Sequence, residues 1–266
     1  MSARRFALAF GVLTMASVGA MAADLPRKAP APAYAPPPVS VNQWTGCYVG
    51  LNAGAVWGRM NDDWTPNPAG FPNSAQLSRV QTTGSGSLDG TGFTGGGQIG
   101  CNWQMNQLVL GAEADMQYTG LDESRDVTVL LPGVGTGSET YHEDFRSRWL
   151  STFRGRLGWL LNPTWLIYGT GGLAVANIES TDTVLLVGGT TNTVSGSSTR
   201  AGWTVGGGVE WMFAPQWSVK AEYLYVDLGS FSTTSVNSDP THPNTTINHD
   251  HHLTENIARV GVNYHF

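Results

Sequence analysis

Hydrophobic side chains alternate with small or polar ones along eight segments of this chain. In the segment LVLGAEADMQY, Leu108, Leu110 and Met116 fall on one parity, whereas Glu113 and Asp115 fall on the other. Successive side chains of a β-strand point to opposite faces of the sheet, so the pattern predicts strands with one apolar and one polar face. The predicted strands span approximately 44–58, 90–104, 107–121, 146–161, 165–179, 199–213, 216–228 and 255–266.

The connections between these segments are alternately long and short. Short turns are predicted at Gln104–Asn106, Asn162–Thr164 and Ala214–Pro215. The long connections, rich in Thr, Ser, Gly, Asn and Asp, are 59–89, 122–145, 180–198 and 229–254. This order is typical of strands that cross an outer membrane, where one side has short turns and the other has long loops. We therefore predict an all-β fold, an antiparallel up-and-down eight-stranded transmembrane β-barrel with four extracellular loops, closed because an open edge in lipid leaves backbone groups unsatisfied.

Acids and bases are nearly balanced on the polar faces. A soluble sheet can show the same alternation with its charges in water, but aromatic residues near the strand ends and Gly runs on the polar face favour a barrel with its apolar face toward lipid. Eight strands leave room only for their own side chains. We predict a packed polar interior, with a small channel for ions or small solutes as the alternative. The predicted interior charge network comprises Glu113, Asp115, Arg148, Arg154, Arg156, Glu210, Lys220, Glu222 and Arg259.

The N-terminal segment has the order of a secretory signal. Two Arg residues precede an apolar run and the tripeptide Ala20-Met21-Ala22, so residues 1–22 are predicted to be a signal peptide that is removed on export. Residues 23–43, which hold six Pro, are predicted to form an extended periplasmic leader, and residues 44–266 the barrel.

Composition agrees with a membrane location. Only 13% of the residues are charged, whereas a soluble domain carries about 25%. After removal of residues 1–22, Lys and Arg number 12 against 20 acids, a formal charge of −8. This charge argues against nucleic acid as a partner.

The chain resembles a known family at many of these segments. The matching motifs are AADLP, the Pro-rich leader, WTGCYVGLNAG, GFTGGGQIGCNWQ, RGRLGW, IYGTGGLA, WTVGGGVEWMF, WSVKAEYLYVDLG and RVGVNYHF. They are similar to those of the proteobacterial outer-membrane β-barrel family of major surface immunogens, related to opacity-type and OmpA-like barrels. The resemblance implies a location in the outer membrane. It also implies that the final strand, which ends in Phe266, is the signal read by the barrel-assembly machinery.

Two cysteines fall in the first two predicted strands. Cys47 and Cys101 share the outward parity with Val49 and Ile99, so antiparallel pairing can bring them opposite each other. Export to an oxidising compartment permits a disulfide. The alternative is two thiols without a role.

A cluster of histidines lies in the last predicted loop. Within THPNTTINHDHH, the candidates for metal or haem capture are His242, His249, His251 and His252. Imidazole is a common ligand of transition metals. The alternative is a solvated loop without a ligand, and we expect no resident cofactor.

No pattern of residues indicates catalysis. The Gly-rich stretches lie in predicted strands, and the nucleophile and metalloprotease motifs of known enzymes are missing from the sequence. We therefore expect a structural and surface-interaction protein rather than an enzyme. Its expected partners are outer-membrane lipid and lipopolysaccharide, the assembly machinery, and host molecules or phage that contact the loops.

Overall fold

A computed structural model describes residues 43–70, 74–130, 138–185, 191–236 and 246–266. The predicted signal peptide and nearly all of the predicted leader lie outside these ranges and stay predictions. The described strands are β1 (Gly46–Pro66), β2 (Gly86–Met105), β3 (Leu108–Leu130), β4 (Ser138–Asn162), β5 (Trp165–Leu185), β6 (Thr191–Ala214), β7 (Trp217–Val236) and β8 (Thr246–His265). A 3-10 turn η1 (Pro68–Gly70) and a helix α1 (Ser74–Gly84) follow β1.

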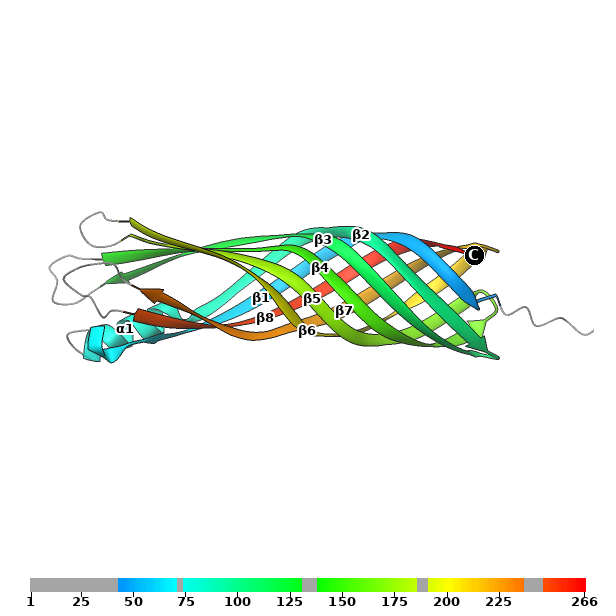
Figure 1. Cartoon of the computed structure of the whole chain (residues 1–266), viewed down its shortest axis with the longest axis horizontal. Helices are drawn as coiled ribbons and strands as arrows, with labels where there is room; N and C mark the ends of the chain where they lie inside the picture. Colours follow the sequence, from blue (N-terminus) through cyan, green and yellow to red (C-terminus); the bar gives the residue numbers. More distant parts are fainter. Residues whose placement is uncertain (1–42, 71–73, 131–137, 186–190, 237–245) are drawn as a thin grey trace, which may run out of the picture. The chain divides into compact units, whose positions relative to one another are not determined.

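The eight strands form a closed barrel in sequence order (Figure 1). Every neighbouring pair is antiparallel, and β1 pairs with β8 from Tyr48 opposite His265 to Pro66 opposite Ile247. This last pairing satisfies both edges of the sheet. The predicted fold class is therefore confirmed. Within the described ranges, no helix is both long enough and apolar enough to cross a membrane.

Tight turns join the strands at one end of the barrel. Two residues separate β2 from β3, β4 from β5, and β6 from β7. Asn106 adopts a positive φ of 56° in the first of these turns, a conformation that Asn tolerates better than most residues. Asn162 stabilises the second turn, since its Oδ1 accepts hydrogen bonds from the backbone N–H groups of Thr164 and Trp165.

The exterior of the barrel carries a belt of exposed apolar side chains. Along β1 the outward residues Val49, Leu51 and Trp57 are exposed, whereas the intervening Asn52 and Val56 are buried. The belt extends around the other strands through Phe93, Ile99, Met116, Phe153, Leu157, Leu173, Val205, Val209, Tyr223, Val260 and Val262. Aromatic residues mark its border near the short turns, including Trp103, Trp159, Trp165, Trp211, Trp217 and Phe266. Such a band with aromatic borders matches the hydrocarbon layer and its interfaces.

The strands continue well past this belt on the side away from the short turns. Much of the predicted loops 59–89, 122–145, 180–198 and 229–254 is paired strand or helix α1, so the predicted strands were too short at this end of the barrel. The reason is the composition of these segments. Thr and Val are common in them, and these β-branched residues favour strands. Their inward residues also still pack together: Trp64, Val127 and Tyr141 form an apolar cluster with Val80 of α1.

Candidate functional site in the barrel interior

Eight of the nine side chains predicted for the interior charge network lie buried inside the barrel. They are Glu113 and Asp115 of β3, Arg154 and Arg156 of β4, Glu210 of β6, Lys220 and Glu222 of β7, and Arg259 of β8. The strand alternation places them there, since residues two apart share a face. Four acids face four bases, so the network is formally neutral.

Arg154 occupies the centre of the network. Its Nη2 contacts Asp115 Oδ2 at 2.7 Å and its Nη1 contacts Glu222 Oε1 at 3.0 Å. Nη2 also pairs with Glu113, and Nε donates to Thr152 Oγ1. Nε, Nη1 and Nη2 therefore each have a partner, which is the condition under which a buried guanidinium is tolerated.

Lys220 and Arg259 connect the far side of the barrel to the same acids. Lys220 Nζ lies 2.8 Å from Glu113 Oε1, and Arg259 Nη2 lies 2.6 Å from Glu222 Oε2 and 3.0 Å from Asp115 Oδ2. β3 and β7 stand four places apart in the eight-stranded ring, so the Lys220–Glu113 pair spans the bore.

Arg156 forms a second layer nearer the short turns. Its Nη2 contacts Glu210 Oε2 at 2.7 Å, and its guanidinium carbon lies 4.0 Å from the ring centroid of Tyr168. Tyr48 donates from its hydroxyl to Glu113 and accepts there from Arg156 Nη1. Neither Tyr was predicted as a member of the network, although the inward parity of Tyr48, opposite to that of Cys47 and Val49, was a usable signal.

Apolar layers lie along the bore on both sides of the charges. Toward the short turns, Trp44, Val109, Leu160, Leu166, Tyr168 and Met212 form one buried cluster. Toward the other end, Val56, Leu121, Leu150, Leu224 and Ile257 belong to a second. On β4, for example, Leu150 precedes Arg154 and Arg156, and Leu160 follows them. The charge network thus occupies a middle section of the bore between two apolar layers, an arrangement that the alternation pattern did not predict.

Arg148 is the exception among the predicted interior charges, and that prediction was wrong. Its side chain is 40% exposed and pairs with Glu179 at 3.0 Å. The register of β4 against β5 shifts between Ser147 and Trp149. A bulge of this kind adds one residue to the strand and reverses the parity beyond it. Ser147 and Leu150 therefore point inward, and Arg148 does not.

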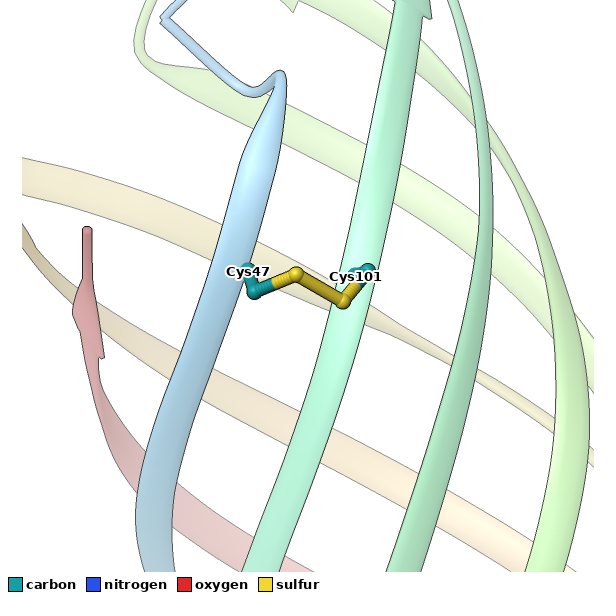
Figure 2. The surroundings of a disulfide bond; sticks show 2 residues. All are labelled: Cys47 and Cys101. Atoms are coloured by element: carbon teal, nitrogen blue, oxygen red, sulfur yellow. A yellow bond between two sulfur atoms is a disulfide. The ribbon is translucent and has the colours of Figure 1, made fainter.

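Cys47 and Cys101 are joined by a disulfide between β1 and β2 (Figure 2). They are register partners near the short turns. Phe266 follows β8, is largely exposed, and its N–H donates to the carbonyl of Cys47 at 3.0 Å. Its predicted part in assembly stays a prediction.

The described part of the histidine segment, residues 246–252, is a strand and not a loop. His249, His251 and His252 belong to β8, whereas His242 lies outside the described residues. Alternation turns His249 and His251 into the barrel, and there they meet Asp62 of β1. His252 points outward toward Asp227 and is 42% exposed. Asp62 was not among the predicted ligands because its segment was expected to be a loop.

Several acidic and imidazole groups at this end have shifted pKa values. Burial raises the pKa of Glu143 to about 8, and the nearby negative charge of Asp62 adds to the increase. Burial lowers the pKa of His251, although Asp62 opposes the change. The pKa of Asp62 is lowered, because hydrogen bonding and charge from the two histidines outweigh the opposing effect of burial.

A closed antiparallel barrel with a lipid-compatible exterior and a polar middle defines a transmembrane β-barrel of the outer-membrane type. The chain belongs to the family described as outer membrane protein beta-barrel domain, whose model matches residues 8–266. This confirms the predicted family and location: it is an outer-membrane protein.

Named relatives agree with this assignment. The 31 kDa outer-membrane immunogenic protein of Brucella melitensis is 34% identical over 257 residues, which cover 96% of this chain and 97% of the relative. The 25 kDa outer-membrane immunogenic protein of Brucella abortus is 28% identical over 94% of this chain and 92% of its own length.

Solved barrels are similar only at a distance. The outer membrane protease OmpT of Escherichia coli aligns with a TM-score of 0.47 and 9% identity, over 83% of this chain and 97% of its own. The outer membrane protein OprG of Pseudomonas aeruginosa aligns with a TM-score of 0.46 and 11% identity, over 84% and 97%. At such values no function is transferred from either protein.

Proposed function

We propose that the chain is a structural and surface-interaction protein: a rigid barrel with a closed interior that anchors an extramembrane surface, and not an enzyme. The observation that carries the proposal is the Lys220–Glu113 pair, whose atoms lie 2.8 Å apart across the bore. Side chains from opposite walls that touch leave no straight path for ions between them. The apolar clusters on both sides of the network support the same conclusion.

Energetics also favours a closed bore. The side chains of Arg154, Lys220 and Glu222 are fully buried. Opening a water path requires these pairs to separate, and breaking a buried pair by removing one partner costs about 3–5 kcal/mol. The interior ion pairs therefore link opposite strands of the barrel and stabilise its closed interior.

Planar-bilayer recordings of the refolded full-length protein test this proposal. We expect no reproducible current steps from the wild-type barrel, and no steps from a matched surface variant, Arg59→Gln, whose side chain is 60% exposed. Folding of each sample is checked by its gel mobility with and without boiling. Steady conductance steps from correctly folded wild-type protein would instead support the alternative, a small porin-like channel. The observation that favours this alternative is the charged interior, because ions pass more readily along polar side chains.

The surface role concerns the part of the barrel beyond the apolar belt. The Brucella relatives are named immunogenic proteins. This supports a cell-surface position for the part of the barrel beyond the belt. We place contacts with lipopolysaccharide, host molecules or phage there, because binding is commonly carried by outer segments on a rigid scaffold.

Surface labelling of intact cells tests the orientation. A cysteine-reactive, membrane-impermeant reagent should label a Ser78→Cys variant, because Ser78 is exposed on helix α1. The same reagent should not label a Gln216→Cys variant, at an exposed position in the short turn between β6 and β7, until the cells are lysed. The reversed labelling pattern would contradict the proposed orientation.

A further inference from the structure

Asp62, His249 and His251 form a buried cluster inside the extramembrane end of the barrel. Asp62 of β1 and His251 of β8 are register partners, and His249 lies two residues before His251 on the same face. The three side chains are between 0% and 8% exposed. They lie beyond Trp57, toward the end opposite the short turns, and so outside the apolar belt.

The donor atoms of the three residues converge. One ligand atom from each lies within 4.8 Å of the others. His251 Nδ1 is 3.3 Å from Asp62 Oδ1, and His249 Nδ1 is 3.7 Å from Asp62 Oδ2. Ligands bound to a tetrahedral zinc ion at about 2.0–2.2 Å lie roughly 3.2–3.6 Å apart. These two separations are therefore close to the spacing of ligands that share one ion.

Two of these atoms have no hydrogen-bond partner. Asp62 Oδ1 and His251 Nδ1 are buried and unsatisfied, although they face each other. A buried polar atom without a partner is destabilising, because it has lost its hydrogen bonds to water and gained none in return. A bound cation would satisfy both lone pairs at once.

The surrounding residues orient the ligands in the manner of a metal site. His251 Nε2 forms a hydrogen bond of 3.1 Å with Thr233 Oγ1, and Trp64 Nε1 donates to Asp62 Oδ2 at 2.6 Å. Metal-ligating imidazoles and carboxylates usually have such second partners, which hold the ring and the carboxylate in place. In the tautomer that donates Nε2–H to Thr233 Oγ1, Nδ1 carries the lone pair that a metal requires.

The charge balance at this end also favours a cation. Asp62, Glu143 and Asp182 act on one another electrostatically, and Asp182 also acts on His249. Arg125 contacts Glu143 at 3.3 Å, and Arg200 acts on His251. Asp250 also acts on His251, and Asp144 acts on Asp182, so before the histidines are counted the acids around the cluster outnumber the bases even when Glu143 is protonated.

We infer that Asp62, His249 and His251 bind one divalent transition-metal ion of the zinc type. Two imidazoles and a carboxylate are a known ligand set for zinc and related ions. The ion joins β1 to β8, the first and last strands, at the end of the barrel that lies outside the membrane. This inference goes beyond the proposed function and does not depend on a closed bore.

Titration of the refolded full-length barrel in detergent tests the site, after removal of metal with a chelator. The probes are Zn²⁺ by calorimetry and Co²⁺ by its visible absorption. We expect one saturable equivalent, with binding weakened at least about tenfold in Asp62→Asn and in His251→Gln, in line with the effect of losing even a second partner of a ligand. The matched control is His252→Gln, which removes a neighbouring but outward imidazole and should bind as the wild type does.

Two results would overturn the inference. One is an absence of saturable binding to folded wild-type protein, and the other is an equal loss of affinity in His252→Gln, which would indicate adventitious binding by surface histidines. Because a variant can fail to fold, X-ray absorption of the zinc-loaded wild type provides a second measurement. It should report two imidazole ligands with the rest oxygen, and a shell without imidazole would contradict the site.

Discussion

The ring of Tyr48 fills the space in front of Gly100, its register partner on β2. A Cβ atom at position 100 would lie 2.5 Å from Tyr48 Cζ and Oη. Tyr48 in turn contacts Glu113 and Arg156. Because Gly100 has no side chain, Tyr48 has room to reach the charge network.

The first prediction concerns this contact. Gly100→Ala should lower the free energy of unfolding by about 1–3 kcal/mol, the usual cost of overpacking. Gly97→Ala is the matched control, because its nearest neighbour would be 3.8 Å away, and it should have little effect. Urea unfolding in lipid vesicles measures both, and equal stability of the two variants would contradict the role given to Tyr48.

Removing one partner from the network should be costly. Lys220→Met leaves Glu113 without its ammonium partner from across the bore and should destabilise the barrel by about 3–5 kcal/mol. The double variant Lys220→Met, Glu113→Gln should lose less than the sum of the two single variants, since neither charge is then left alone. Additive losses in the same unfolding assay would argue that the two residues do not interact.

The disulfide should stabilise the barrel by lowering the conformational entropy of the unfolded chain. Cys47 and Cys101 are separated by 54 positions in the sequence, and closing a loop of this size is worth about 2–4 kcal/mol. Cys47→Ser with Cys101→Ser should therefore unfold at lower urea than the oxidised wild type. Reduced wild-type protein should behave like the double variant, and unchanged unfolding after reduction would count against the prediction.

His142 should titrate above its ordinary pKa. Its Nδ1 lies 2.6 Å from Asp126 Oδ1, outside the apolar belt, and this hydrogen bond raises its pKa. The associated stabilisation is present at pH values below the unfolded pKa and is lost as the pH rises through the folded one. NMR titration of the imidazole should give a lower pKa in Asp126→Asn, and an unchanged value would rule out the pair in solution.

A substitution at Phe266 tests its predicted role in assembly separately from the stability of the folded barrel. Its side chain is 72% exposed, so Phe266→Ala should leave the refolded barrel nearly as stable as the wild type. If the residue is part of the assembly signal, the same variant should reach the outer membrane in smaller amounts in cells. Wild-type levels in the membrane fraction would remove the assembly role.

Alternation of residue types was enough to predict the barrel and most of its charged interior, because a strand assigns side chains to faces by parity alone. It failed at Arg148, since a bulge changes parity without a local sequence signal. It also failed for the partners of His249 and His251. Contacts between β1 and β8 join residues at opposite ends of the chain, and only barrel closure reveals that Asp62 lies opposite His251.

The pairing of β1 with β8 continues from the apolar belt as far as Pro66 opposite Ile247. In the orientation proposed above, the cell displays a collar of hydrogen-bonded strands, in which neighbouring surface residues come from distant parts of the polypeptide. Antibodies that recognise this collar should bind discontinuous epitopes and lose them when the protein is boiled. A linear peptide copied from one strand would then reproduce only a part of such an epitope.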